Sequence, residues 1–232
     1  MSQYLLIDSI NRDVLEPNYN FTVQFKNNIK IQKYIKLIYA SIPITNYNLN
    51  LTNNKLRINN TNIFISIGSY DSTTLATELK NMLVIAFPLN NFNVSYIDKL
   101  FKYNITGTNP FTLNLSQSTI NIVLGFGKND ITNNNIISDY AANLLGPNYL
   151  SVKLSGIENN IKSNAKTNLG FIIPLTVNEG GISYFNSKTN YPQKTNVLYE
   201  LNFISCNIQL LLPDNSFFDN NNIDWVLLFE YE

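Results

Sequence analysis

Short apolar or alternating runs, separated by clusters of Asn, Asp, Gly and Pro, dominate the chain. Residues 21–25 alternate with period two, and residues 55–58 and 63–67 flank an Asn-rich turn. Alternation predicts half-buried strands, and the polar clusters between runs predict turns. We predict further strands over residues 31–42, 93–97, 101–105, 111–115, 149–154, 170–177, 182–185, 197–203, 204–212 and 225–231. Regularly spaced strands with turn signals between them are typical of a sandwich or barrel, so the pattern predicts an all-β fold.

Two segments depart from the strand pattern and predict short helices inserted in the connections. Residues 71–87 place apolar side chains at helical spacing, with Asp71 or Ser72 as N-cap and Pro88 as the stop. Residues 116–124 form a shorter candidate that ends at Gly125. The polar region 126–148 predicts a long ordered loop, because it has few apolar residues to bury. With no linker in sight, we predict one domain over residues 1–232.

Composition excludes several classes of function. The 232 residues include no His, one Cys, and 16 basic against 16 acidic residues. A Ser-His-Asp triad, a Cys-His pair and imidazole or cysteine metal sites are therefore excluded, and a specific nucleic-acid partner is not expected without a basic face. No apolar stretch approaches a membrane span, and no secretory signal is present, so we expect synthesis in a reducing cytoplasm. Cys206 is interpreted as a small buried hydrophobe.

Candidate chemical motifs are weak. Gly125-Phe126-Gly127-Lys128 fails the phosphate-loop pattern, and a helix cap and turn explain it. Gly180-Gly181 is interpreted as a hairpin turn. The acids Asp214, Asp219 and Asp224 fit solvated turns, an intersubunit contact or a cation site, and the sequence leaves these open. We predict no catalytic, cofactor-binding or metal-binding residues, and no cofactor.

The charges are unevenly distributed along the chain. Lys26, Lys30, Lys33 and Lys36 lie in a stretch without acids, whereas the chain after Lys194 carries acids and no basic residue. Pairing of opposite charges across one sheet is one explanation. A head-to-tail contact in a closed ring is the other, because two different patches must then complement each other.

Four blocks, in order along nearly the whole chain, resemble the single jelly-roll penton or minor capsid proteins of virophages and related large double-stranded DNA viruses. The first runs from Asp8-Ser9-Ile10-Asn11-Arg12-Asp13 through residues 17–23 and 35–48, and the second joins residues 63–70 to the predicted helix. The third is Ile122-Val123-Leu124-Gly125-Phe126 with residues 149–152. The fourth is residues 207–210, Pro213-Asp214-Asn215 and residues 224–230.

The resemblance implies a two-sheet antiparallel jelly roll, a single β-sandwich, that forms pentamers at icosahedral vertices and contacts the double jelly-roll major capsid protein. It also implies an N-terminal interface arm over residues 1–18. The location that it implies for the protein is the capsid of the virion. An insertion domain, if present, should be confined to residues 126–148. The resemblance and the charge pattern together predict these interface residues: Asp8, Arg12, Asp13, Lys26, Lys30, Lys33, Asp219 and Asp224.

Other functions remain open at the level of the sequence. A minor capsid or cement protein of the same lineage would share these motifs. A carbohydrate- or receptor-binding module is a further alternative, because jelly rolls serve many functions. An enzyme is disfavoured, because the sequence shows no catalytic constellation.

Overall fold

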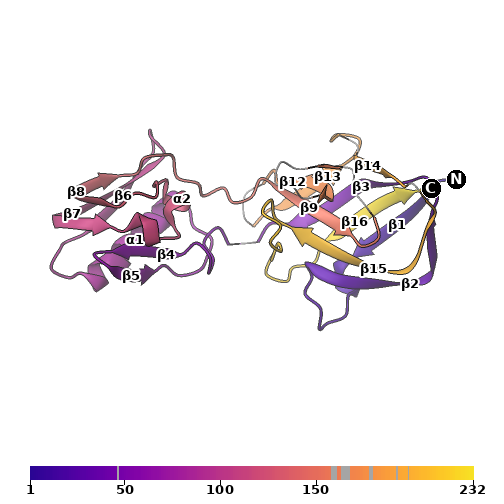
Figure 1. Ribbon diagram of the computed structural model, residues 1–232, viewed down its shortest axis with the longest axis horizontal. Helices are drawn as coiled ribbons and strands as arrows, with labels where there is room; N and C mark the ends of the chain where they lie inside the picture. The colour runs from indigo at the N-terminus through magenta and orange to yellow at the C-terminus, as the bar shows by residue number, and fades with distance from the viewer. Residues whose placement is uncertain (46, 158–160, 163–167, 178–179, 192, 198) are drawn as a thin grey trace. The chain divides into compact units, whose positions relative to one another are not determined.

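The computed structural model describes the whole chain except residues 46, 158–160, 163–167, 178–179, 192 and 198. Asn46 of the first block and Leu198 of a predicted strand thus lie outside the described residues. The chain divides into two compact units (Figure 1), one of residues 1–46 and 147–232 and one of residues 47–146. The prediction of a single domain therefore differs from the observed division, and the second unit is inserted into the first.

The first unit is a sandwich of two antiparallel sheets. One sheet has the order β1-β16-β3-β13, with β14 also paired to β3, and the other has the order β12-β9-β15-β2. The strands are β1 Gln3–Asp8, β2 Asn20–Ile31, β3 Tyr34–Pro43, β9 Tyr149–Leu154, β12 Phe171–Pro174, β13 Ile182–Asn186, β14 Gln193–Asn196, β15 Leu201–Leu211 and β16 Val226–Tyr231. A 3-10 turn η1, Ser9–Asn11, and a small hairpin of β10, Ile161–Lys162, and β11, Asn168–Leu169, complete the unit.

The path of the chain identifies this sandwich as a jelly roll. The chain crosses from sheet to sheet at β2, β3, β9, β13, β15 and β16, and its first and last strands are neighbours in one sheet. Two sheets wound in this way define the jelly roll, so the predicted fold is confirmed. The insertion interrupts the connection between β3 and β9.

Alternation along the strands places the core between the sheets. In β3 and β16 every second side chain is buried over most of the strand, and the aromatic pairs Phe21–Trp225 and Phe171–Phe229 lie in this core, with ring centroids 5.5 and 5.2 Å apart. Aromatic side chains contribute large buried areas, so these pairs dominate the packing. The predicted strands 197–203 and 204–212 are one strand, β15, with an irregularity near Ile204.

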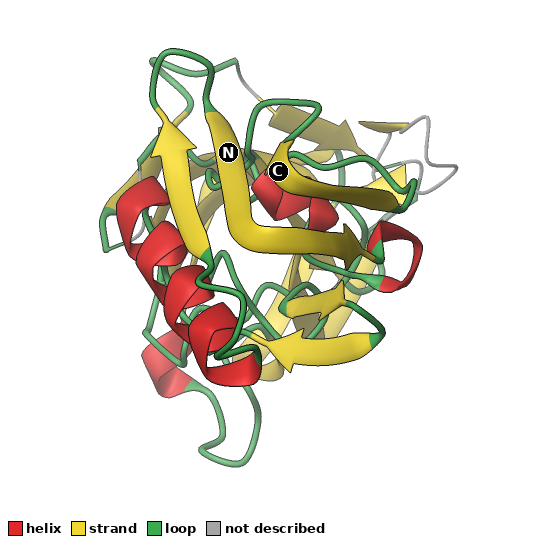
Figure 2. Ribbon diagram, turned by 90° about the vertical axis from the view of Figure 1, so that its left-hand side faces the viewer, coloured by secondary structure: helices red, strands yellow, loops and turns green. Residues whose placement is uncertain are grey.

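The second unit packs helices against an antiparallel sheet. Its sheet has the order β5-β4-β7-β6, with β8 also paired to β7, and helix α1 contacts β6 and β5 (Figure 2). The elements are β4 Lys55–Ile58, β5 Thr61–Phe64, α1 Ser72–Ala86, β6 Asn93–Ile97, β7 Lys102–Leu113, η2 Leu115–Gln117, α2 Asn121–Leu124 and β8 Ile131–Ile137. Both predicted hairpins and the longer helix are confirmed.

Two sequence predictions for this unit need correction. Residues 126–148 are not one long loop, because Ile131–Ile137 forms β8 and places Ile136 in the core. The insertion is also not confined to those residues, since it begins near Tyr47. It forms a separate body because it has its own apolar core, centred on Leu79, Tyr103 and Phe111.

Asparagine has a conformational role in the turns. Among the described residues, every non-glycine residue with positive φ except Phe101 is an asparagine: Asn59, Asn60, Asn91, Asn215, Asn221 and Asn222. Asn tolerates the left-handed region better than other residues with a side chain. The sequence, with 9 Gly, thus uses Asn at many tight turns where glycine is otherwise common.

Candidate functional site

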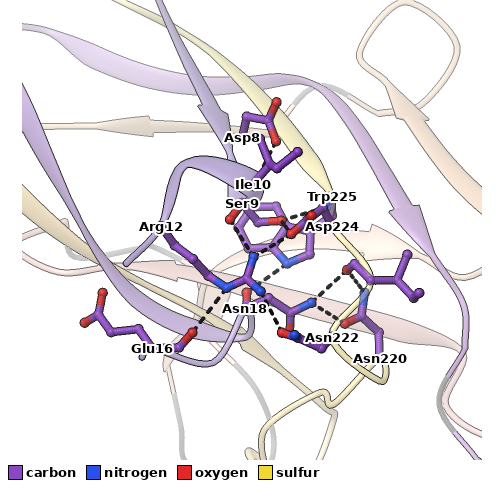
Figure 3. A network of polar contacts seen from close by, with 11 residues as sticks. Asp8, Ser9, Ile10, Arg12, Glu16, Asn18, Asn220, Asn222, Asp224 and Trp225 are labelled. Carbon is purple, nitrogen blue, oxygen red and sulfur yellow. Dashed lines mark hydrogen bonds and ion pairs between the residues drawn. The ribbon is translucent and has the colours of Figure 1, made fainter. Parts of the chain in front are cut away.

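The most connected polar cluster lies at one end of the sandwich, where residues 8–18 meet residues 220–225 (Figure 3). These two segments come from opposite ends of the chain. β1 pairs with β16 so that Asp8 lies beside Val226, and the Ser9 N–H donates to the Trp225 carbonyl at 3.0 Å. The first and fourth sequence blocks of the resemblance therefore meet in space.

Arg12 is the centre of this cluster. Its guanidinium donates from Nη1 to Asp224 Oδ1 at 2.5 Å and to the Ser9 carbonyl at 2.7 Å, and from Nη2 to Asn222 Oδ1 at 2.7 Å. Nε donates to the Glu16 carbonyl at 3.2 Å. Only 11% of the side chain is exposed. Because Arg presents its donors in a rigid fork, these bonds fix the turn after β1 against the turn before β16.

Asn18 and Trp225 extend the cluster into the core. The Asn18 amide donates to Asn220 Oδ1 and to the Ile223 carbonyl, both at 2.7 Å, and Trp225 Nε1 donates to the Asn18 carbonyl at 2.9 Å. Ser9 Oγ accepts from the Trp225 backbone N–H at 2.8 Å and donates to Asp224 Oδ1 at 2.9 Å. Buried polar groups must find partners inside the protein, so this cluster closes the sandwich at its end.

The same end holds the segment that leaves the sandwich after β3. Thr45 Oγ1 donates to the Asn220 carbonyl, and Asn221 Nδ2 donates to the Thr45 carbonyl. The Ile44 N–H donates to the Gly181 carbonyl at 2.9 Å. Ile44 and Thr45, which precede the insertion, are thus held to the sandwich by hydrogen bonds.

The structure separates the predicted interface residues into two groups. Arg12 and Asp224 form an ion pair within the unit, and Lys33 pairs with Glu232 at 2.7 Å. Lys36 and Glu230 add a further pair at 3.8 Å, so cross-sheet pairing accounts for much of the uneven charge distribution. The other five predicted residues make no ion pair in the described part of the chain: Asp8, Asp13, Lys26, Lys30 and Asp219.

The three unpaired acids occupy turns. Asp8, Asp13 and Asp219 accept hydrogen bonds from the backbone N–H two residues later, at 3.1, 3.0 and 2.9 Å. Asp13 and Asp219 are exposed, and Asp8 is half-buried. Lys26 and Lys30 are exposed on β2, an edge strand paired only with β15. These five charges are available for contacts with another molecule.

Ionisation follows the internal pairs. Hydrogen bonds from the Tyr34 and Ser2 hydroxyls, together with Lys36 and Lys194, lower the pKa of Glu230. Lys33 lowers the pKa of Glu232, and Glu232 in turn raises the pKa of Lys33. These charges therefore favour the folded sandwich at neutral pH.

Sequence reasoning missed the residues that link the two turns. Glu16 accepts from the Thr22 N–H through both carboxylate oxygens at 3.3 and 3.2 Å, and Asn18 and Asn220 are buried. Asn18 stands in the first block, but Glu16 and Asn220 lie outside all four blocks, so no pattern in the sequence singled them out. Asp224 and Arg12 were identified, but their partnership depends on a pairing across more than two hundred residues that no local pattern reveals.

The described residues include one cysteine, Cys206, and no histidine. No cluster of His, Cys, Asp and Glu able to hold a metal ion occurs among them. In that same part of the chain, no helix has the length and apolar character needed to span a bilayer. Burial raises the pKa of the Cys206 thiol, which disfavours the thiolate. The interpretation of Cys206 as a buried hydrophobe is confirmed.

Gly125-Phe126-Gly127-Lys128 forms a cap and turn, as predicted. Gly125 ends α2 in the left-handed conformation, with φ of 79°, and its N–H donates to the Ile122 carbonyl. Phe126 is buried after it. The segment belongs to the core of the inserted unit.

Comparison with known proteins finds similarity among solved structures. No protein-family model and no curated protein matches the chain. Among solved structures, the crystal structure of the selenomethionine-labelled mavirus penton protein is similar over 100% of this chain and 99% of that one, with a TM-score of 0.56 and 11% sequence identity. This match shows that the two proteins share a fold over their whole lengths, insertion included.

Proposed function

We propose that this chain is a structural capsid protein, a penton subunit that forms pentamers at icosahedral vertices and contacts the double jelly-roll major capsid protein. The observation that carries the proposal is the end-to-end similarity to a penton protein, 100% of one chain and 99% of the other. A jelly roll alone serves many functions. A fold shared over nearly the whole length of both chains is more restrictive than a shared sandwich.

The proposed mechanism is assembly without chemical turnover. The two-sheet core makes the sandwich a rigid block, and the Arg12 cluster fixes the turns at one of its ends. Rigid blocks pay little ordering cost when they associate. We assign the assembly contacts to the charges that the fold leaves unpaired and treat Arg12, Lys33 and Asp224 as residues that stabilise the subunit.

Native mass spectrometry and negative-stain imaging of the purified chain test the proposal. We expect a ring of five, and a labelled chain at the vertices of native particles. A monomer at all concentrations, or label away from the vertices, contradicts the penton role. Label spread over the faces would instead support a cement protein, and a monomer that binds a glycan array would support a receptor-binding module.

A further inference from the structure

The turn between β1 and β2 exposes large apolar side chains that the fold does not use. Val14 is 92% exposed and Leu15 is 89% exposed, and Ile10 precedes them on η1. Asp8 precedes Ile10 and Asp13 precedes Val14, and neither acid makes an ion pair within the described part of the chain. We call Ile10, Val14, Leu15, Asp8 and Asp13 the N-terminal surface. It combines an apolar centre with negative charge.

Another exposed apolar residue, Ile204, lies where the register between β2 and β15 shifts. Phe203 pairs with Ile29 and Ser205 pairs with Gln24, so residues 25–28 of β2 lie opposite Ile204 alone. Ile204 is 61% exposed. Lys26 belongs to this irregular stretch, and Lys30 lies two pairs away opposite Asn202.

Ile204, Lys26 and Lys30 together form what we call the bulge surface. It combines an apolar centre with positive charge, the opposite of the N-terminal surface. Neither lysine has an acidic partner among the described residues. The clustered apolar side chains of the N-terminal surface are the kind of exposed patch that marks a site of protein contact, and the bulge surface offers it one exposed apolar side chain with the opposite charge beside it.

Within one copy, the acids of the N-terminal surface and the lysines of the bulge surface form no ion pair with each other among the described residues. Glu16, which follows Leu15, contacts Thr22 on β2, and Lys26 lies four residues beyond Thr22, which is roughly 13 Å along a strand. An ion pair needs its atoms within about 4 Å. The two surfaces also belong to the same compact unit, so their separation is a property of the sandwich.

We propose that the N-terminal surface of one copy binds the bulge surface of the next. This inference rests on the proposed function and names the contact that would build its ring. Two different patches on one subunit give a head-to-tail contact, and such contacts close into rings when the rotation permits. Opposite charges around apolar centres set the register and disfavour contacts between like surfaces.

A charge exchange tests the pairing in the full-length chain by native mass spectrometry. Asp8→Lys with Asp13→Lys, or Lys26→Glu with Lys30→Glu, should weaken the ring at least about tenfold, because each places like charges in contact. The four substitutions combined should restore the ring. Asp8→Asn with Asp13→Asn removes the charges but keeps the oxygens that accept the turn hydrogen bonds, so it should weaken the ring without lowering the melting temperature.

Apolar substitutions test the centres of the two surfaces. Val14→Ser with Leu15→Ser, and separately Ile204→Ser, should weaken the ring while leaving the melting temperature unchanged, since these side chains are exposed. Lys188→Glu and Leu89→Ser alter exposed residues outside both surfaces. These two controls should leave the ring intact.

The outcomes separate this inference from the proposed function. A ring that persists in every surface variant overturns the pairing but leaves the penton role standing. Variants that form rings but fail to enter particles also overturn it, because the surfaces then face the shell. A wild-type chain that never forms a ring contradicts the penton role itself.

Discussion

The sandwich and the inserted unit are built by opposite routes. In the sandwich, Gln3 pairs with Tyr231, so the first sheet is complete only when the two ends of the chain have met. In residues 47–146, β4 pairs with β5 and β6 pairs with β7, each across a short turn. Local pairings cost less loop-closure entropy and form sooner. We therefore expect the inserted unit to fold before β16 pairs and completes the sandwich.

In each unit, a separate set of side-chain hydrogen bonds joins the segments where the chain enters and leaves. The Arg12 cluster joins the ends of the sandwich, whereas Asn48 joins the ends of the inserted unit by donating to the Tyr70 carbonyl at 2.7 Å and to the Leu144 carbonyl at 3.1 Å. We therefore expect the two units to unfold in separate transitions. The sequence has one Trp, Trp225, and it lies in the sandwich core, so its fluorescence reports on the sandwich alone.

The largest expected effect comes from the sandwich core. Trp225→Ala removes the ring that packs on Phe21 and the N–H that binds the Asn18 carbonyl. We expect a loss of about 3–5 kcal/mol in the unfolding free energy of the sandwich. Hydrogen exchange read by mass spectrometry should show lost protection in residues 147–157 and 201–231 but retained protection in residues 47–146. Equal loss in both units would show that they fold as one.

The matched truncation in the inserted unit is Leu79→Ala. Leu79 is a fully buried residue on the core-facing side of α1, so its truncation should cost the inserted unit about 3 kcal/mol. The fluorescence transition of Trp225 should keep its midpoint, while protection in residues 72–113 falls. Ile85→Ala, on the exposed side of the same helix, is the control and should change neither.

A smaller effect is expected at the closure of the inserted unit. Asn48→Ala leaves the carbonyls of Tyr70 and Leu144 and the N–H of Tyr70 without this partner, at a cost of about 2 kcal/mol. Exchange should accelerate first in residues 47–54 and 66–72. An unchanged exchange pattern there, with a weakened sandwich, would contradict the assignment of Asn48 to the inserted unit alone.

The smallest effect is a pH dependence confined to the sandwich. The pKa of Glu230 is lowered in the folded state, so its contribution is present above the unfolded pKa and is lost as the pH falls through the lower folded value. Glu230→Gln should cost about 0.5 kcal/mol at pH 7, and its difference from wild type should vanish at low pH. The Trp225 fluorescence midpoint, followed by urea titration from pH 7 to pH 3, measures this, and a difference that grows on acidification would contradict it.

The contrast between the units explains what sequence reasoning could reach. Helix α1 was predicted because its cap, periodicity and stop are local, and Asp71 indeed accepts from the Thr73 and Thr74 N–H groups. The hairpin at Asn59 and Asn60 was predicted for the same reason. The jelly roll came from the resemblance, since alternation alone indicated only a sandwich or barrel.

The errors arose where distant segments decide the structure. Strand β8 lies in a polar stretch and is fixed by pairing with β7, and Ile136 is its only fully buried residue, so the strand shows no alternating pattern. The bounds of the insertion depend on which residues share a core. The internal partners of Arg12, Asp224 and Asn222, were not predicted because they lie at the other end of the chain. An interface role stays a prediction for all eight residues named for it: Asp8, Arg12, Asp13, Lys26, Lys30, Lys33, Asp219 and Asp224.

The termini of the sandwich lie side by side, with the Met1 amino group 3.5 Å from Glu232 (Figures 1 and 2). They sit at the end of the first sheet that is farthest along β3 from Pro43, where the chain departs for the insertion. A circular permutant that joins the present ends and opens the chain beside residue 146 would therefore keep every strand of the sandwich. In such a protein the inserted unit would be a C-terminal domain, and another protein domain could replace it.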